Sequence, residues 1–348
     1  MPNFRRRRIL AVLLVVLVGL GGAAYLNRSA IRAGWSQLFA ADFAGPGHGS
    51  VTFEVSSGDD GETITRNLVK AGVVKDFDTS YRIVLDSNPT FYPGTFNLKL
   101  EMSTRGALAV LTDQNAVVTN QVTVREGLRI YNVFKALSDA TDLPVSDFES
   151  AAKDLTALGI PNSAPSAEGY LFPATYRFSP DATAAQILKQ MVNRTYQELD
   201  SFGVAVKDRH KVLTLASIIE KEARQADDFY KVSRVFKNRL KINMPLQSDA
   251  TVSYGSGGNT VTTTDAERAD QNGYNTYVHY GLPIGPISAP GSHAIDAALH
   301  PADGNWIYFC AVNLKTGETV FSETAAQHSV AVEQFRAWIR ANPGWNGS

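Results

Sequence analysis

One stretch of the chain predicts a helix that carries two glutamates beside apolar residues: Val212-Leu-Thr-Leu-Ala-Ser-Ile-Ile-Glu-Lys-Glu-Ala-Arg224. Its apolar stripe recurs at helical spacing and consists of Val212, Leu215, Ile219 and Ala223. A helix turns by about 100° per residue, so Glu220 shares a flank with Leu213 and Ala216. Glu222 lies roughly 200° away from it, on the other side of the helix. The two carboxylates are therefore not expected to share one pocket.

Glu220 is the carboxylate that this pattern places beside apolar and small side chains. Burial penalises the charged form of a carboxyl group, so apolar surroundings keep it protonated at higher pH. Cleavage of a glycosidic bond needs such a protonated carboxyl group near neutral pH. Arg224 is four residues further on, and an ion pair with it would favour the charged form of Glu220. A solvated Glu-Lys-Glu helix end fits the same periodicity, so the pattern alone leaves both interpretations open.

Downstream of this helix the sequence becomes rich in proline, glycine, tyrosine and amide side chains. The relevant runs are Met244–Asp249, Tyr274–Tyr277 and Gly281–Gly291. Prolines and glycines fix loops, and loops that carry aromatic, amide and hydroxyl groups suit a sugar ligand. Such loops are also common as purely structural connections, and the composition does not separate the two alternatives.

Upstream, the chain predicts a small α/β module followed by a mostly helical body. Residues 27–50 are interpreted as a linker, because Gly45-Pro-Gly-His-Gly-Ser50 is typical of a flexible boundary. Periodicity and capping signals then predict alternating elements. These are a strand at 51–55, a helix at 63–72, a turn and strand at 93–98, a helix capped by Ser103, a strand and helix from Val122, helices over 183–240 and a strand at 306–312.

The N-terminus predicts a membrane anchor. Arg5–Arg8 precede residues 9–26, which contain no charge and are rich in Val, Leu and Ile. A helix of this length spans about 27 Å, close to the hydrocarbon core of a bilayer. The positive-inside rule places residues 1–8 in the cytoplasm and the body outside, with a single span. A cleaved signal peptide is the rival interpretation, and it exports the body as well.

Composition narrows the class of function. The 348 residues carry a net charge of −1; the four arginines account for +4, so the rest carries −5. A mildly acidic body argues against nucleic acid as a partner. The six histidines show no close metal-binding spacing, so no metal site is expected. Cys310 cannot form an internal disulfide and is interpreted as a small hydrophobe in the buried strand at 306–312.

Several ordered motifs together resemble the YceG-like family, the MltG-type endolytic murein transglycosylases. The resemblance extends over roughly residues 50–335. Its motifs are Glu168-Gly-Tyr-Leu-Phe-Pro173 with Thr175-Tyr176, Leu215–Glu222, Val235-Phe236, Asn238-Arg-Leu240, Leu246-Gln-Ser-Asp249, Thr251-Val252 with Tyr254, Tyr274-Asn-Thr-Tyr277, Gly281-Leu-Pro283, Pro286-Ile-Ser288 and Pro290-Gly291.

The resemblance implies an α+β fold in which the membrane helix is followed by a LysM-like α/β subdomain at 51–120 and a helical, loop-rich catalytic domain at 121–341. It implies that Glu220 is the catalytic acid/base and that no cofactor is needed. The residues expected to bind substrate are Glu168, Tyr170, Asn238, Gln247, Asp249, Thr251, Tyr254, Tyr274, Asn275, Thr276 and Tyr277.

The expected function is that of a peptidoglycan lytic transglycosylase in cell wall assembly and remodelling. It would cut the linkage between N-acetylmuramic acid (MurNAc) and N-acetylglucosamine (GlcNAc) and leave 1,6-anhydro-MurNAc ends. Glycan strands and the cytoplasmic membrane are the expected partners, with peptidoglycan synthases as further candidates. Two alternatives stay open. One is a non-catalytic, membrane-anchored peptidoglycan-binding protein. The other is a pyridoxal-phosphate-dependent lyase, which the export anchor and the absence of a recognisable cofactor-phosphate motif oppose.

Overall fold

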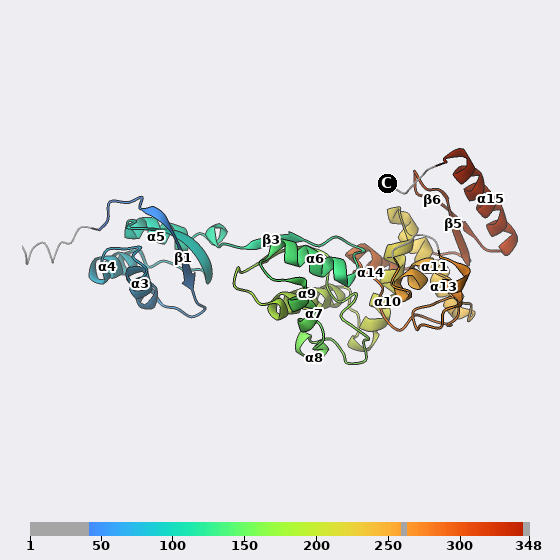
Figure 1. Cartoon of the computed structure of the whole chain (residues 1–348), viewed down its shortest axis with the longest axis horizontal. Coiled ribbons are helices and arrows are strands. Elements are labelled where there is room, and N and C mark those ends of the chain that lie inside the picture. The colour runs from blue at the N-terminus through green and yellow to red at the C-terminus, as the bar shows by residue number, and fades with distance from the viewer. Residues whose placement is uncertain (1–41, 259–262, 344–348) are drawn as a thin grey trace, which may run out of the picture. The chain divides into compact units, whose positions relative to one another are not determined.

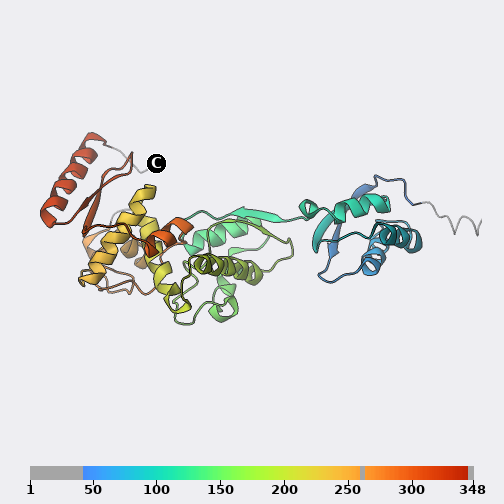
Figure 2. The same cartoon turned by 180° about the vertical axis from the view of Figure 1, so that it is seen from behind.

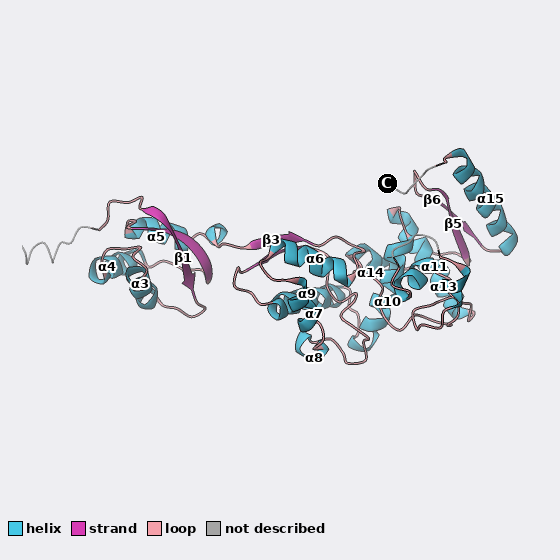
Figure 3. Ribbon diagram, in the orientation of Figure 1, coloured by secondary structure: helices cyan, strands magenta, loops and turns pink. Residues whose placement is uncertain are grey.

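The computed structural model describes residues 42–258 and 263–343, and the chain divides into two compact units after Thr119. The predicted membrane helix at 9–26 and the first part of the predicted linker lie outside the described residues. Across these two ranges, no helix is both long enough and apolar enough to cross a membrane. The fold is a mixed α+β one, and the described residues form three separate two-stranded sheets (Figure 3).

The first unit is built on an antiparallel hairpin. Strand β1 (His48–Val55) pairs with strand β2 (Gly94–Leu100), so that Phe53 lies opposite Phe96. Side chains alternate between the two faces of a strand, and the inward ones here are fully buried apolar residues. The strand predicted at 51–55 is confirmed inside β1. The turn and strand predicted at 93–98 are confirmed by β2, which begins at Gly94 and extends to Leu100.

Three helices surround this hairpin: α3 (Gly61–Lys70), α4 (Phe77–Ser87) and α5 (Thr104–Leu111) (Figure 1). Each begins with a side chain that accepts a hydrogen bond from a free amide of the first turn. The capping residues are Asp60, Asp76 and Ser103. The predicted cap at Ser103 is thus confirmed, whereas α4 was not among the predicted elements.

The end of the predicted linker belongs to the first unit. Asp42 accepts hydrogen bonds from the backbone nitrogen and the hydroxyl group of Thr104, at 2.7 and 3.1 Å. Strand β1 already begins at His48. The expectation of a flexible linker up to residue 50 is therefore corrected for residues 42–50. Its glycines occur here because the chain passes close to the hairpin: a β-carbon at Gly47 would lie 2.6 Å from the carbonyl oxygen of Leu100.

The second unit starts with a short antiparallel pair and continues as a helical body. Strand β3 (Asn120–Thr123) pairs with β4 (Thr175–Phe178). The helices are α6 (Ile130–Ala140), α7 (Val145–Ala151), α8 (Leu155–Leu158), α9 (Ala184–Ser201), α10 (Arg209–Glu222), α11 (Ala226–Lys241), α12 (Asp249–Gly255), α13 (Asp265–Ala269), α14 (Ser292–Leu299) and α15 (Ala325–Ala341). Short 3₁₀ turns lie at Gln114–Ala116, in the first unit, and at Val206–Asp208.

Helix α10 lies at the centre of this body. All residues from Leu213 to Ile219 are buried, including the polar Thr214 and Ser217. The single apolar stripe expected from the sequence is therefore wrong, because α11 and α14 pack against α10 from different directions (Figures 1 and 2). Helix α14 contributes small residues to this contact, which allows a close approach of the two helices.

The C-terminal part is a hairpin with a covering helix. Strand β5 (Tyr308–Asn313) pairs with β6 (Glu318–Ser322), and α15 packs on this hairpin. The sequence predicted a single buried strand at 306–312. In the structure β6 is added, and Cys310 is half-buried rather than buried. The reason is that one face of the hairpin lines an open cavity, described next.

Candidate active site

Helix α10 ends where its two glutamates lie. The backbone of Ala223 is extended, with ψ of 144°, so the helix stops and the following residues turn away. Glu220, Lys221 and Glu222 therefore belong to a terminal turn that follows the buried middle of the helix, Leu213–Ile219. A helix held in this way gives these side chains fixed starting positions.

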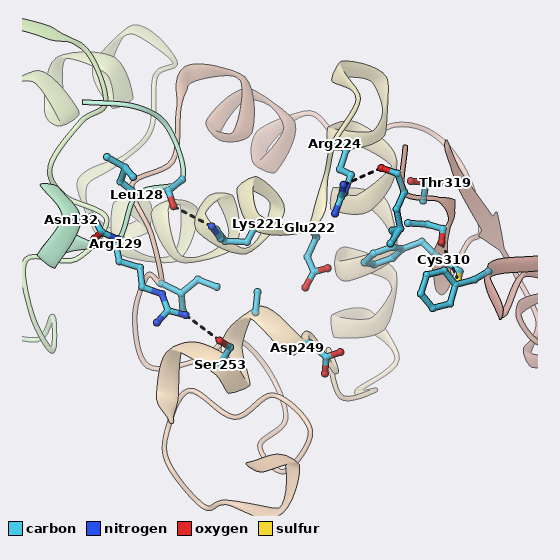
Figure 4. Close-up of a pocket in the computed structure, with 17 residues that line it drawn as sticks. Leu128, Arg129, Asn132, Lys221, Glu222, Arg224, Asp249, Ser253, Cys310 and Thr319 are labelled. Carbon is cyan, nitrogen blue, oxygen red and sulfur yellow. Dashed lines mark hydrogen bonds between the residues drawn. The ribbon is translucent and has the colours of Figure 1, made fainter. Parts of the chain in front are cut away.

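A cavity of about 550 Å³ opens beside this terminal turn (Figure 4). Its walls come from the end of α10, the segment leading into α6, helix α12 and the β5–β6 hairpin, all within the second unit. Both glutamates of the motif lie nearby, but Glu222 lines the cavity and Glu220 is not among its lining residues. The charged residues that line it are Arg129, Lys221, Glu222, Arg224 and Asp249.

Glu222 is half-buried and directed into the cavity (Figure 4). Ser248 donates a hydrogen bond from its hydroxyl group to Oε1 of this carboxyl group. Burial raises the pKa of Glu222, and the negative charge of Asp249 raises it further. The hydrogen bonds from Ser248 and Ala250 and the charge of Arg239 act in the opposite direction. The net result is a carboxyl group that keeps its proton at a higher pH than usual.

Asp249 is the second carboxylate of the cavity and the first residue of α12. Its Oδ1 accepts hydrogen bonds from the hydroxyl groups of Tyr277 at 2.9 Å and Thr263 at 2.6 Å. These two donors come from the segments before and after α13, and they fix the orientation of the carboxylate. The sequence named Asp249 and Tyr277 as substrate-binding residues, and of these two only Asp249 lines the cavity.

Arg129 forms the opposite wall. Its guanidinium donates to the carbonyl oxygen of Gly258 at 2.6 Å and to the hydroxyl oxygen of Ser253 at 3.3 Å. It also lies over the ring of Tyr254, 5.3 Å from the ring centroid. Arg129 thus ties the start of α6 to the end of α12. Sequence reasoning missed Arg129 and Ser253, because nothing local to either residue indicates that they meet.

Glu220 has different surroundings. It is half-buried, and its Oε2 accepts a hydrogen bond from the backbone nitrogen of Gly291 at 3.1 Å. Burial raises the pKa of Glu220, the Gly291 hydrogen bond opposes this, and the charge of Glu126 raises it further. The expectation that the two glutamates occupy different surroundings is confirmed. Glu222 lines the cavity, whereas Glu220 lies next to Gly127, one of the residues that line it.

Glu168 is fully inside the protein, with 2% of its surface exposed. Both of its oxygens accept the backbone N–H of Ile130, at 3.1 and 3.0 Å, which holds the first residue of α6. Burial raises the pKa of Glu168 to about 7, against the hydrogen bonds from Ile130 and Tyr254 and the charge of Arg129. Glu168 therefore positions the segment that carries Arg129. Glu168 itself does not line the cavity.

Gly169 lies where the motif Glu168–Pro173 packs against the motif Pro286–Ser288. Gly169 has φ of +77°, and a β-carbon there would lie 2.3 Å from the β-carbon of Pro286. Tyr170 is buried, and its hydroxyl group bonds to Nδ1 of His210 at 2.9 Å. Only glycine permits this backbone conformation and this close contact. The two motifs are thus parts of one packed interface.

Most of the other residues named from the sequence hold the loops together. Asn238 donates to the carbonyl oxygens of Gly304 and Trp306, at 3.1 and 2.9 Å. Thr251 and Thr276 are buried and bond to each other at 2.8 Å. None of these side chains lines the cavity, nor do Glu168, Tyr170, Gln247, Tyr254, Tyr274, Asn275 and Tyr277.

Asn275 has the most complete set of such bonds. It is fully buried, and its side-chain nitrogen donates to the carbonyl oxygens of Glu267, Arg268 and Asp270. Gln247 is exposed and lies in the left-handed backbone region, with φ of +49°. Direct contact with a substrate was predicted for both residues, and it stays a prediction. In the structure the side-chain nitrogen of Asn275 holds the loop together through its bonds to backbone carbonyl groups.

A metal-binding cluster was not expected. Within residues 42–258 and 263–343, no three side chains of His, Cys, Asp or Glu come together as metal ligands would. The charged groups of the cavity are two carboxylates and three basic side chains. These groups can exchange protons with a substrate and bind its charged substituents.

Comparison with known proteins gives a consistent set of relatives. The YceG-like family model matches residues 53–334 of the chain. The endolytic murein transglycosylase of Bacillus subtilis is 31% identical over 307 residues, covering 82% of this chain and 85% of that protein. The endolytic murein transglycosylase of Streptococcus pneumoniae serotype 2 is 26% identical over 318 residues, covering 80% of this chain but only 57% of that protein. The crystal structure of a protein described as YceG-like from Listeria monocytogenes matches with a TM-score of 0.54 and 30% identity, covering 81% of this chain and 99% of that one.

Proposed function

The chain belongs to the YceG-like family, and we propose that it is an endolytic murein transglycosylase that cuts the glycan strands of peptidoglycan. The observation that carries this proposal is the cavity in which a half-buried Glu222, with a raised pKa, lies beside a second carboxylate, Asp249. A glycosidic bond is cleaved by a protonated carboxyl group acting on the leaving oxygen. The relatives whose printed name states this activity support the choice of substrate.

Glu222 is the general acid in the mechanism that we propose. It donates its proton to the oxygen that links C1 of MurNAc to GlcNAc, and the C1–O bond breaks. The N-acetyl carbonyl oxygen of the same MurNAc attacks C1, while Asp249 offers negative charge to the oxocarbenium-like transition state. Glu222, now a carboxylate, takes the proton of the C6 hydroxyl group. The C6 oxygen then bonds to C1, and the bond between C1 and the N-acetyl oxygen breaks, which restores the neutral N-acetyl group. No water is consumed, and the product is a 1,6-anhydro-MurNAc end.

The choice between the two glutamates rests on the cavity. The family resemblance and the apolar flank of α10 pointed to Glu220. Glu220 also has a raised pKa, but its carboxylate is bonded to Gly291 and does not line the cavity. A general acid must reach the oxygen that it protonates, so geometry takes priority over the pKa. We therefore propose Glu222 as the acid/base and Glu220 as the second candidate, and the variants in the Discussion separate them.

The alternative function is a non-catalytic protein that only binds peptidoglycan. Incubation of the purified protein with sacculi, followed by mass spectrometry of the soluble products, distinguishes the two. A transglycosylase releases 1,6-anhydro-MurNAc ends from inside the strands and produces long as well as short fragments. If the strands bind to the protein but no anhydro ends form, the binding function is correct and the transglycosylase proposal is wrong.

We also propose that the protein is a single-pass protein of the cytoplasmic membrane, with residues 1–8 inside and the body outside. The support comes from the sequence, where Arg5–Arg8 precede the uncharged run 9–26. A reporter fused after Ser348 that is active only outside the cytoplasm tests this topology. An active cytoplasmic reporter at the same position would contradict it.

The first unit is proposed to be a LysM-like subdomain that contacts glycan strands. Its hairpin and the three flanking helices support this by their size and order. Peptidoglycan synthases are proposed as partners, since an enzyme that cuts strands outside the membrane can act where the strands are made. Chemical cross-linking in cells followed by identification of the linked proteins tests whether synthases are partners.

A further inference from the structure

Two of the three basic side chains that line the cavity are exposed, and neither has a carboxylate partner. Lys221 and Arg224 are exposed and lie on either side of Glu222 (Figure 4). Among the described residues, no carboxylate oxygen lies within 4.0 Å of either cationic group. Their hydrogen bonds go to backbone carbonyl groups, from Lys221 to Gly127 at 3.2 Å and from Arg224 to Leu314 at 3.4 Å.

A neutral sugar chain does not require these charges. Most surface lysines and arginines are simply solvated, but these two belong to the wall of a concave site. Cations in a concave site raise the local positive potential and attract anionic groups of a ligand. The planar guanidinium of Arg224 fits a carboxylate with two parallel hydrogen bonds, and an ammonium group binds it as a point charge.

Asp249 limits where an anionic group of the substrate can lie. Its negative charge repels a second carboxylate from the position where the sugar ring must react. An anionic substituent is therefore directed away from Asp249 and toward Lys221 and Arg224. The reacting sugar carries such a substituent: MurNAc bears a lactyl group, to which the peptide stem is attached, and the stem carries carboxylates.

We propose that Lys221 and Arg224 bind carboxylates of the peptide stem, so that the cavity selects strands with anionic stems. This inference rests on the proposed function, because it takes the glycan strand as the substrate. The two side chains would contribute mainly to binding, and their effect would depend on salt because exposed charges are screened. A merely structural role, through the bonds to Gly127 and Leu314, would instead affect all strands equally.

The test compares two substrates that differ only in charge: glycan strands with intact stems, and the same strands after chemical conversion of the stem carboxylates to carboxamides. For the wild type we expect kcat/KM to be about tenfold higher on the anionic strands at low salt. The double variant Lys221→Gln/Arg224→Gln should bring this ratio close to one, mainly through KM. The charge-conserving variants Lys221→Arg and Arg224→Lys should keep the ratio. Lys211→Gln, an exposed lysine on the same helix outside the cavity, is the matched control.

A binding measurement separates this inference from the proposed function. Calorimetry with the Glu222→Gln protein gives the affinity for both kinds of strand without turnover, at low and high salt. A preference for anionic strands that disappears at high salt, and in a Lys221→Gln/Arg224→Gln/Glu222→Gln protein, supports the inference even if no strand is ever cut. Equal affinity for both strands, or an unchanged preference in the triple variant, overturns it and leaves the transglycosylase proposal intact.

Discussion

Glu220 and Glu222 are two residues apart, yet their neighbours give them different chemistry. Glu220 is bonded to the amide of Gly291, whereas Glu222 faces a cavity together with Asp249. Because a helix turns by about 100° per residue, the side chains of Glu220 and Glu222 point in directions that differ by roughly 200°. The sequence could predict this separation from periodicity alone. It could not predict which direction leads to the cavity, because the other walls come from residues such as Arg129 and Phe309, which are distant in the chain.

The charge of Asp249 is expected to set the pH range of the reaction. Asp249 raises the pKa of Glu222, so Asp249→Asn should lower that pKa and shift the alkaline limb of the kcat/KM profile to lower pH. The amide oxygen of Asn can still accept from Tyr277 and Thr263, so the loop should remain in place. The measurement is product release between pH 4 and 9, with the exposed Asp303→Asn as control. An unshifted limb would show that Asp249 does not act on the acid.

Glu168 is expected to make stability depend on pH. Its pKa is about 7 in the folded protein and 4.5 in an ordinary environment, so the folded state holds the proton more tightly. This stability is fully present below about pH 4.5 and is lost as the pH rises through 7. Relative to Glu168→Gln, which does not titrate, the wild type should lose about 3 kcal/mol of unfolding free energy over this window. Urea unfolding at several pH values measures it.

The matched control for this experiment is Glu149→Gln, an exposed glutamate on α7. Its unfolding free energy should follow the wild-type pH dependence. If the difference in unfolding free energy between Glu168→Gln and the wild type stays constant from pH 4 to pH 8, then Glu168 does not titrate in this range. The raised pKa of Glu168 would then be wrong.

At the scale of the elements, Ser217 fixes α10 against the loop that precedes α14. Its hydroxyl group donates to the carbonyl oxygen of Thr214 at 2.8 Å and accepts from the backbone nitrogen of Ile287 at 3.0 Å. In Ser217→Ala the buried amide of Ile287 loses its partner, which typically costs about 1–3 kcal/mol. Because Ile287 lines the cavity, activity should fall as well.

Denaturant unfolding checks this expectation, with Ser201→Ala as the control. Ser201 is exposed and its hydroxyl group donates only to a carbonyl group of its own helix. The control should stay within about 0.5 kcal/mol of the wild type. A Ser217→Ala protein that is equally stable would mean that the Ile287 amide finds another partner.

Patterns among neighbouring residues were enough to predict strands and helix caps. The contacts that form the site join residues far apart in the sequence, and these could not be predicted. The strands at 51–55 and 93–98 and the cap at Ser103 follow from alternation and from a side chain that bonds its own helix. Asn275 and Thr276 looked like sugar-binding groups because amides and hydroxyls in loops serve that purpose. Both are buried, and their bonds to backbone and side-chain groups of other segments cannot be inferred from spacing.

At the scale of the molecule, the chain consists of two units, and the lining of the cavity comes only from the second. A fragment of residues 120–348 should therefore fold and release anhydro ends from short soluble strands. Circular dichroism and product analysis check this, with a fragment that starts at residue 42 as the reference. A folded reference that is active, together with an unfolded or inactive shorter fragment, would contradict the independence of the second unit.

Whether Glu222 or Glu220 is the acid/base is decided by one pair of variants, Glu222→Gln and Glu220→Gln. The measurement is the rate at which 1,6-anhydro-MurNAc ends form on purified strands, with melting temperatures to confirm folding. Loss of a general acid typically lowers the rate by about 10²–10⁴-fold, and the upper end is expected because Glu222 also serves as the base. We expect this loss for Glu222→Gln and a much smaller one for Glu220→Gln. A folded Glu222→Gln protein that forms anhydro ends at the wild-type rate, while Glu220→Gln forms none, would contradict this expectation and assign the chemistry to Glu220.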